Sequence, residues 1–421
     1  MNPLVKATLI WVCRILTGGI FIASGFLKGI DPWGTLYKVE EYSSALGFNF
    51  WDSLLVFFTF LLCAVEFICG VFLITGCLRR SMPWVGMLIM CFMVPLTLWI
   101  AIKNPVADCG CFGEALYLSN WGTFWKNIVI SCLLIFLIKY NDRQPSLILA
   151  PIQWILLLVS FFYLFAIELT GYRIQPLIDF RNYPVGESLT DNGDAEELKN
   201  YVFAYKKNGE IKNFKLTDEM PDEDSGWEFV GRLEIASNET INKNKEKALN
   251  IWDLTEESDQ TDVIEENEGL MLILFSPQIR KISPATTWKI NLLYDWAKAH
   301  GIKMIAVISG NEDDIKHWED LSMADYPIYL SDDTVIKEIV RGNPGIVLLD
   351  GNKIEWKTTL SSLDMDQIEE FESSQDIRYI KGDNQNILLL ITSIYLIIIS
   401  FLVVVSLFPV LIKKIIKHEK P

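Results

Sequence analysis

Cysteine is absent after residue 132 of this 421-residue chain, and histidine is scarce in all of it. Residues 171–385 contain no cysteine, so this part cannot carry out thiol exchange and must be stable from its apolar core alone. The three histidines, His300, His317 and His418, have no ligand-like spacing. We therefore expect no metal site.

Basic residues are also outnumbered in the cysteine-free part. Residues 171–385 carry 23 basic and 43 acidic side chains, a net charge of −20, whereas the rest of the chain carries 14 basic and 10 acidic ones, a net charge of +4. A surface at −20 repels phosphate backbones, which excludes an ordinary nucleic-acid binder. The composition predicts an acidic soluble domain joined to a membrane part, with membrane lipid as one partner.

Six apolar stretches are long enough to cross a bilayer as helices, for which about 20 residues are needed. They cover approximately residues 7–27, 53–75, 82–102, 121–138, 147–167 and 387–412. The first five predict a membrane bundle over residues 1–170. The sixth, with the basic tail of residues 386–421, predicts a C-terminal membrane anchor.

The basic residues of the short loops predict the orientation of these spans, because lysine and arginine near span ends are retained in the cytoplasm. They fall at alternate span ends: Lys6, Arg79, Arg80, Lys139, Arg143, Lys413, Lys414, Lys417 and Lys420. Both termini are then cytoplasmic. The loops 29–52 and 103–120 and the acidic domain lie outside.

Two of the eight cysteines lie close together between apolar stretches, in the segment KNPVADCGCFGEALYLSNW of residues 103–121. Cys109 and Cys111 flank one glycine, and a ring closed across it would be strained and easily reduced. Three lysines at the same boundary, Lys28, Lys103 and Lys126, would favour the thiolate form. The pair is thus a candidate redox couple. A glycine turn with two incidental cysteines, or part of a soft-metal site, is the alternative.

Two charged residues stand within predicted spans, where an unpaired charge costs about 3 kcal/mol or more. Arg14 lies in the first span and Glu66 in the second, at depths that would let them meet. We expect a buried ion pair that fixes the register of the two helices, with a proton or quinone role as the alternative.

The acidic part carries two patterns of regular structure. Residues 200–216 alternate around Asn208–Gly209, a strong hairpin signal, and predict a β-rich collar within residues 171–265. Residues 269–370 alternate between apolar strands and amphipathic helices and close with a hairpin at Asp350–Gly351, which predicts an α/β sandwich with a mixed sheet. Pro344, after Asn343 and before a strand, predicts a fixed proline turn.

The membrane part resembles a known family. The string RILTGGIFIASGFLKGIDPWG from residue 14, Glu66, and DCGCFGE from residue 108 resemble the DoxX-like membrane proteins, specifically the methylamine-utilisation MauE branch, over residues 7–140. The resemblance implies a four-helix bundle in a bacterial inner membrane and kinship with quinone-linked disulfide-forming proteins, so a quinone is the cofactor under a redox function. Those oxidases use a further cysteine pair outside the membrane, which this chain lacks.

The segment 269–370 is similar to a thioredoxin-like domain, with Pro344 at the family's cis-proline position. Where that family carries its Cys-x-x-Cys, this chain reads SPQIRKISPAT from residue 276, so the dithiol is missing. The resemblance predicts an α-helical membrane bundle plus an α/β thioredoxin-like extracytoplasmic domain, over residues 266–380, with a β-rich collar.

Two functions follow from these features. In one, the chain is a non-catalytic subunit or docking scaffold of an envelope complex, binding periplasmic or membrane proteins through its acidic periplasmic domain. In the other, it is a membrane thiol–disulfide oxidoreductase that uses Cys109 and Cys111. The missing second cysteine pair and the missing thioredoxin dithiol favour the scaffold.

Overall fold

A computed structural model of the protein describes most of the chain. The described residues are 3–48, 51–104, 110–116, 118–143, 145–190, 201–207, 210–215, 228–234, 249–254, 256–363 and 384–418. The chain divides into two compact units. The first unit comprises Met1–Arg181, Val340–Gly345 and Lys357–Pro421, and the second comprises Asn182–Ile339 and Ile346–Trp356.

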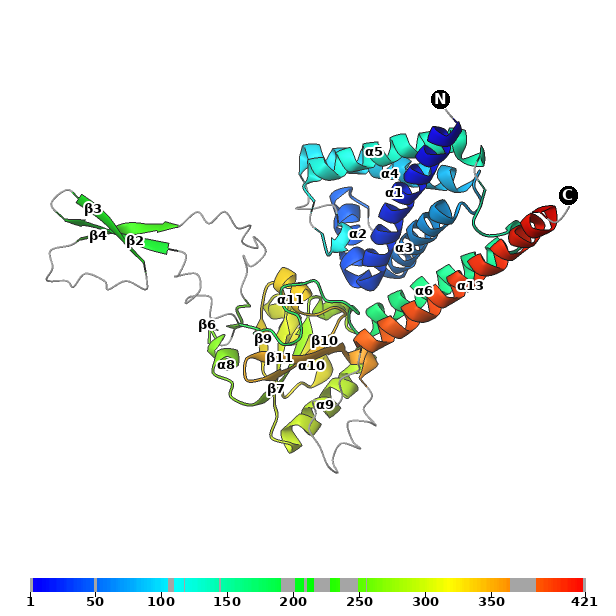
Figure 1. Ribbon diagram of the computed structural model, residues 1–421. Coiled ribbons are helices and arrows are strands. Elements are labelled where there is room, and N and C mark those ends of the chain that lie inside the picture. The colour runs from blue at the N-terminus through cyan, green and yellow to red at the C-terminus, as the bar shows by residue number, and fades with distance from the viewer. Residues whose placement is uncertain are drawn as a thin grey trace. The chain divides into compact units, whose positions relative to one another are not determined.

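The first unit is built from long apolar helices (Figure 1). These are α1 (Pro3–Ile30), α3 (Asp52–Thr75), α4 (Met82–Lys103), α5 (Asn120–Tyr140), α6 (Gln153–Arg173) and α13 (Asn384–His418). Among the described residues, these six helices are long and apolar enough to cross a membrane. The prediction of six spans is therefore confirmed, and the helices begin and end within a few residues of the predicted stretches.

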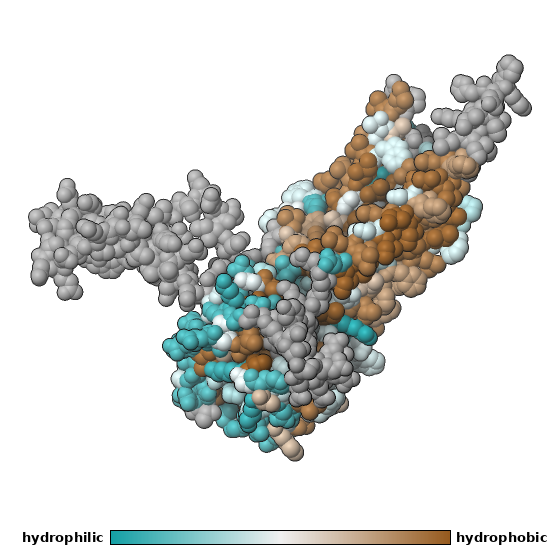
Figure 2. Space-filling model, turned by 60° about the horizontal axis from the view of Figure 1, so that its bottom comes forward, coloured by the Kyte–Doolittle hydropathy of each residue, from teal (hydrophilic) through white to brown (hydrophobic). Residues whose placement is uncertain are grey.

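The outward faces of these helices are apolar, as a hydrocarbon environment requires. Brown, hydrophobic surface covers the helical part in Figure 2, whereas teal surface predominates on the mixed-sheet part. Large exposed side chains on the helices include Leu88, Phe92, Phe162, Ile397 and Phe401. This hydropathy pattern is that of an integral membrane protein.

Small residues allow α1 and α3 to cross closely. A Cβ atom on Gly18 would lie 2.7 Å from the carbonyl oxygen of Gly70, and a Cβ atom on Gly70 would lie 2.6 Å from that of Gly18. Seven residues further along α1, a Cβ atom on Gly25 would lie 2.5 Å from the backbone nitrogen of Phe67. Only glycine permits this approach of two backbones, as in other membrane helix pairs.

The C-terminal helix α13 packs along α6 through aromatic and hydroxyl groups. The rings of Tyr163 and Tyr395 are stacked with centroids 4.0 Å apart. Ser160 Oγ lies 2.9 Å from the Tyr395 hydroxyl, and Leu149 N donates to Ser406 Oγ at 3.1 Å. These bonds satisfy polar groups that would otherwise face lipid.

The first unit also contains short elements beside the ends of its long helices. They are α2 (Pro32–Ala45), β1 (Cys111–Glu114), η1 (Asn141–Arg143), η2 (Ala150–Ile152) and η7 (Leu360–Ser362). Helix α2 begins at Pro32 because proline fits the first helical turn and because the Asp31 side chain accepts a hydrogen bond from Gly34 N at 2.9 Å. Residues 340–345 also belong to this unit and contain a cis peptide bond at Asn343–Pro344.

The second unit centres on a seven-stranded mixed sheet in the order β11-β10-β7-β8-β9-β5-β6. Its strands are β5 (Trp252–Asp253), β6 (Ser258–Asp259), β7 (Leu270–Ser276), β8 (Lys303–Ile308), β9 (Ile328–Leu330), β10 (Gly345–Asp350) and β11 (Lys353–Thr359). Strands β7, β8 and β9 are parallel, and β5 is antiparallel to β9. The apolar run LMLILFS forms β7 because it is buried on both faces.

Helices connect these strands, as the alternating pattern predicted. They are α8 (Asp262–Glu265), η5 (Ile279–Lys281), η6 (Pro284–Thr286), α9 (Thr287–Ala299), α10 (Glu312–Ser322) and α11 (Asp333–Ile339). Gly351, with φ of +59°, occupies the turn between β10 and β11. The predicted mixed sheet with helices and its closing hairpin are therefore confirmed.

A separate three-stranded sheet has the order β3-β2-β4, with β2 (Tyr201–Lys207), β3 (Glu210–Lys215) and β4 (Glu228–Glu234). Strands β2 and β3 pair antiparallel with Lys207 opposite Glu210, so the turn falls where the Asn208–Gly209 signal predicted it. Asn208 and Gly209 themselves lie outside the described residues.

Candidate functional site around Cys111

Strand β1 places Cys111 over the end of α1. Cys111 forms a disulfide, and the other six cysteines in the described part of the chain are free. Gly110 and Gly113 take φ values of +59° and +58°, which glycine adopts without strain, and Gly113 N donates to Gly110 O at 3.1 Å. Cys109, the other candidate redox residue, lies outside the described residues.

A buried ion pair lies beside this strand. Lys28 Nζ is 2.9 Å from both carboxylate oxygens of Glu66, and both side chains are almost fully buried. Ser24 Oγ lies 2.8 Å from Glu66 Oε2 and 2.7 Å from Cys111 O. Because a serine hydroxyl has one proton, it can donate to one of these acceptors at a time. Ser24 thus links the cysteine strand to the ion pair.

Cys111, Lys28 and Glu66 line one small cavity of about 20 Å³. This is room for about one water molecule. The other lining residues are Ile20, Phe21, Ser24, Met90, Met93, Lys126, Asn127 and Ile130. Lys126 Nζ also lies 4.4 Å from the centroid of the Phe112 ring, so this ammonium is held against β1. The cavity brings a disulfide cysteine, two lysines and a carboxylate together.

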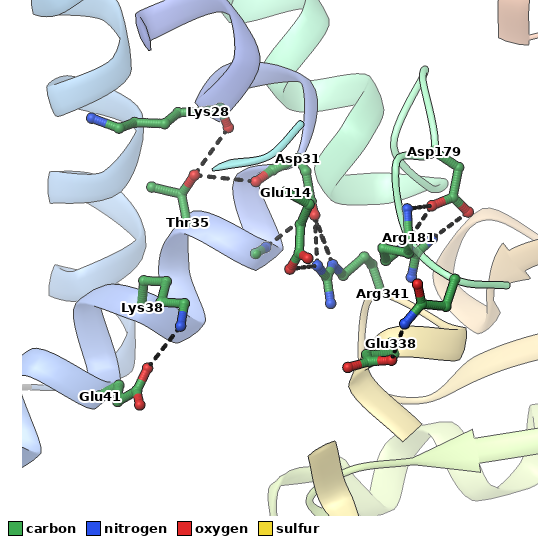
Figure 3. Close-up of polar contacts among 12 residues, drawn as sticks. Lys28, Asp31, Thr35, Lys38, Glu41, Glu114, Asp179, Arg181, Glu338 and Arg341 are labelled. Atoms are coloured by element: carbon green, nitrogen blue, oxygen red, sulfur yellow. Dashed lines mark hydrogen bonds and ion pairs between the residues drawn. The ribbon is translucent and has the colours of Figure 1, made fainter. Parts of the chain in front are cut away.

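The other end of β1 joins a second charged cluster (Figure 3). Arg341, which is 2% exposed, places Nη2 2.7 Å from Asp31 Oδ2 and 2.8 Å from Glu114 Oε1. Its Nε donates to the same Asp31 carboxylate at 2.9 Å. Burial alone would lower the pKa of Arg341, but the Asp31 and Glu114 carboxylates outweigh it and raise that pKa. Burial raises the pKa of the nearby Tyr37 hydroxyl.

Hydrogen bonds hold the backbone of Arg341 as well. Gln175 Oε1 accepts from Arg341 N at 3.0 Å, and Gln175 Nε2 donates to Arg341 O at 2.7 Å. Both peptide groups of this residue are thereby satisfied by one side chain. We call Asp31, Glu114, Gln175 and Arg341 the arginine clasp.

A third cluster adjoins the clasp through Gln175, whose Oε1 accepts from Arg181 at 3.3 Å. Asp179 Oδ2 accepts from Lys357 Nζ at 2.6 Å, and Asp179 Oδ1 accepts from Arg181 Nε at 2.7 Å. Burial would raise the pKa of Asp179, but Arg181 and Lys357 together hold it below its ordinary value. Burial, and then the charge of Arg181, lower the pKa of Lys357 to about 7.

The structure corrects the expected pairing of Arg14 with Glu66. Arg14 Nε instead donates to Asn141 Oδ1 at 2.6 Å and Nη1 donates to Pro145 O at 3.1 Å, while Glu66 binds Lys28. A Cβ atom on Gly76 would lie 2.5 Å from Arg14 Nη1, so the guanidinium reaches the end of α3, ten residues beyond Glu66. Ten helical residues span about 15 Å, which is too far for an ion pair.

The remaining predicted site residues are distributed unevenly. Lys28 and Lys126 line the cavity with Cys111, whereas Lys103 is exposed at the end of α4 and is not among the lining residues. Pro344 follows Arg341 closely, in the segment held by the clasp. The effect of the three lysines on the thiolate stays a prediction.

Sequence reasoning missed the clasp and Ser24. Local signals existed for part of it: Asp31 begins the string DPWG as a helix cap, and Glu114 closes DCGCFGE. Arg341 carries no local signal, because its partners are separated from it by 310 and 227 residues.

Together, the apolar helices, the buried ion pair and the disulfide strand define an integral membrane protein with a helical bundle. A model of the family described as Methylamine utilisation protein MauE matches residues 6–140, so this third of the chain is MauE-like. A model described as a domain of unknown function (DUF8463) matches residues 200–235, which include the three-stranded sheet. Searches of curated proteins and of solved structures found no match.

Proposed function

We propose that this protein is a membrane-embedded thiol–disulfide exchange protein whose redox centre is Cys111 together with Cys109. The observation that carries the proposal is the shared cavity, in which the disulfide residue Cys111 meets Lys28, Glu66 and Lys126. Ammonium groups favour the thiolate that forms when a disulfide is cleaved. A staple that only holds a turn has no need of buried charges beside it, since burying them is costly.

The exchange needs a partner protein with a dithiol. One partner thiolate attacks a sulfur of the disulfide, and the other sulfur leaves as a thiolate and takes up a proton. The partner's second thiol loses its proton and attacks the partner's first sulfur, so that the partner disulfide forms and the bound cysteine sulfur leaves as a thiolate and takes up a proton. Two electrons pass to Cys109 and Cys111, and the two protons lost by the partner balance the two gained here. Lys28 and Lys126 stabilise the departing thiolate.

Thiol trapping in native membranes tests this function. Free thiols are blocked with one maleimide, disulfides are then reduced, and the released thiols are labelled with a second maleimide for mass spectrometry. We expect the oxidised fraction of Cys111 to fall with a dithiol reductant and to recover with an oxidised partner. The buried thiols Cys63 and Cys69 should stay free throughout. A disulfide that resists the reductant, with unchanged growth of a Cys111→Ser strain and of the control strain Cys132→Ser, would refute the redox function.

A second function, docking of envelope proteins on the acidic domain, is favoured by a hollow in the second unit. Its volume is about 540 Å³, and it lies between the segment that follows β7 and helix α10. The lining residues are Ile279, Arg280, Ile282, Pro284, Asp314, His317, Trp318 and Leu321. The sheet order and the parallel strands β7, β8 and β9 support a thioredoxin-like fold, in which this segment stands where the dithiol would be.

Site-specific photo-crosslinking separates the two functions. A photoreactive residue at Leu321 should capture a partner, whereas the same residue at the exposed Lys353 should not. If docking is independent of redox chemistry, the crosslink at Leu321 persists in the Cys111→Ser variant. Equal crosslinking from both positions would count against a docking site in the hollow. The proposal places this domain on the periplasmic side, so capture of a cytoplasmic protein would contradict that sidedness.

A further inference from the structure

Glu168 is a buried carboxyl that the proposed redox chemistry does not use. It lies in α6, five residues before the helix ends at Arg173, and it is 1% exposed. Its side chain packs against α1, because a Cβ atom on Gly29 would lie 3.4 Å from Glu168 Cγ. Neither carboxyl oxygen makes a hydrogen bond of ordinary geometry to the described residues. The thiol of Cys63, a weak donor, faces it.

The ionisable groups of the helices packed around this position are committed elsewhere. Lys28 and Glu66 pair with each other, Asp31 binds Arg341, and the Tyr395 hydroxyl bonds to Ser160. Cys63 on α3 faces the carboxyl and carries no positive charge. The other basic groups described on these helices are also engaged or exposed: Arg14 binds Asn141, Lys6 lies over the Tyr140 ring, Lys38 pairs with Glu41, and Arg173 is exposed at the end of α6. Glu66 therefore has a lysine within hydrogen-bonding distance, whereas none of the described basic groups takes that place at Glu168.

We propose that Glu168 is a proton-binding site of the membrane bundle, which holds a proton at rest and exchanges it with solvent. An isolated carboxylate surrounded by apolar helices has lost its hydration and has gained no counter-charge, so the neutral acid is the stable form. The ligand of this site is a proton. The site does not rest on the redox function and would remain if Cys111 were only structural.

Infrared difference spectroscopy of the full chain in lipid vesicles tests the site directly. At neutral pH, the wild type minus Glu168→Gln should show one band of a protonated carboxyl, and that band should shift in heavy water because the proton exchanges. The same difference for Glu66→Gln should show bands of an ionised carboxylate instead. A carboxylate band for Glu168, or a protonated band that does not shift in heavy water, would overturn the proposal.

A second variant tests whether Glu66 is ionised because Lys28 pairs with it. Removing the ammonium in Lys28→Met leaves Glu66 without its partner, so a second protonated carboxyl band should appear and should vanish in the double variant Lys28→Met/Glu66→Gln.

Reaction with an apolar carbodiimide gives an independent measure of which carboxyl is protonated. The acid proton passes to the reagent, the carboxylate adds to it, and the rearranged product keeps the whole reagent mass. We expect at least a severalfold higher labelling of Glu168 than of Glu66 in the wild type and similar labelling of both in Lys28→Met. Higher labelling of Glu66 in the wild type would contradict the assignment.

Discussion

Glu114 and Arg341 are 227 residues apart in sequence and are joined by a hydrogen bond of 2.8 Å. Glu114 ends the strand that begins with the disulfide residue Cys111. The same arginine binds Asp31, the residue that follows α1. The segment Val340–Gly345 is thus attached directly to the strand that carries the candidate redox centre, and the attachment is made by charge.

The first prediction concerns the arginine clasp. Arg341→Met leaves the carboxylates of Asp31 and Glu114 without their counter-charge and should destabilise the protein by about 3–5 kcal/mol. Thermal unfolding of the full chain in detergent measures the loss. The exposed pair Lys316–Glu312 provides the control, because Lys316→Met should leave the melting temperature unchanged. Equal melting temperatures for Arg341→Met and wild type would show that the clasp does not contribute to stability.

The second prediction separates breaking an ion pair from replacing it. Lys28→Met should lower stability by about 3–5 kcal/mol because Glu66 is left buried without its partner. The double variant Lys28→Met/Glu66→Met should recover much of that loss, since no charge remains to be compensated. Melting temperatures of the two single variants and the double variant form the complete cycle. Additive losses in the double variant would mean that the two side chains do not act as a pair.

The third prediction concerns pH. The pKa of Lys357 is about 7 in the folded protein, against 10.5 for an unperturbed lysine. The unfolded chain therefore binds more protons between these values, and the contribution of Lys357 makes stability rise with pH through this window. The slope is at most about 1.4 kcal/mol per pH unit. The lowered pKa of Asp179 acts elsewhere, since its contribution is lost only as the pH falls below 3.8.

Melting temperatures measured across this pH window compare wild type with Lys357→Met. The melting temperature of the variant should rise less steeply with pH than that of the wild type. The difference between the two curves removes the contributions of other groups that titrate in the same range. Parallel curves for the two proteins would show that Lys357 does not titrate in this window.

The fourth prediction uses two adjacent glycines of α1. A Cβ atom on Gly18 would lie 2.5 Å from the Ile74 side chain, whereas a Cβ atom on Gly19 meets nothing within 4 Å. Gly18→Ala should force α1 and α3 apart and lower the melting temperature. Gly19→Ala should leave it equal or slightly higher, because alanine favours a helix over glycine by up to about 1 kcal/mol. A lower melting temperature for Gly19→Ala than for Gly18→Ala would contradict the observed crossing of the helices.

The fifth prediction separates two lysines that the sequence treats alike. Lys126 lines the cavity with Cys111, and Lys103 is exposed and is not a lining residue. Lys126→Gln should slow the reduction of the Cys111 disulfide severalfold, because the departing thiolate loses a nearby positive charge. Lys103→Gln should leave the rate unchanged. Stopped-flow measurement of thiol release with a dithiol reductant gives both rates, and equal slowing by the two variants would refute a local effect of Lys126.

Sequence reasoning succeeded where the signal was local. The six apolar stretches became helices, and the run LMLILFS became the buried strand β7, because hydropathy and its period depend on neighbouring residues. The turn at Asp350–Gly351 was placed correctly for the same reason. Cys111 was also expected near Lys28 and Lys126, because its loop follows a predicted span on the same side of the membrane as the ends of the two spans that carry these lysines.

The pairing of charges could not be predicted in the same way. Counting residues placed Arg14 and Glu66 at similar depths, but the long arginine side chain extends to the end of the bundle, where Asn141 and Pro145 supply acceptors. The partner of Glu66 is decided by how α1 and α3 cross, which the glycines permit but do not specify. Arg341 illustrates the limit most clearly, since its partner Asp31 lies 310 residues away.

The double role of Asp31 has a consequence for biosynthesis. Its carboxylate caps α2 through Gly34 and also binds Arg341, which emerges from the ribosome 310 residues later. At about 5–20 residues per second, this interval lasts roughly 15–60 s. During that time the helix can already be capped, while the side of the carboxylate that will receive the guanidinium is still open to water. The arrival of Arg341 ends this period.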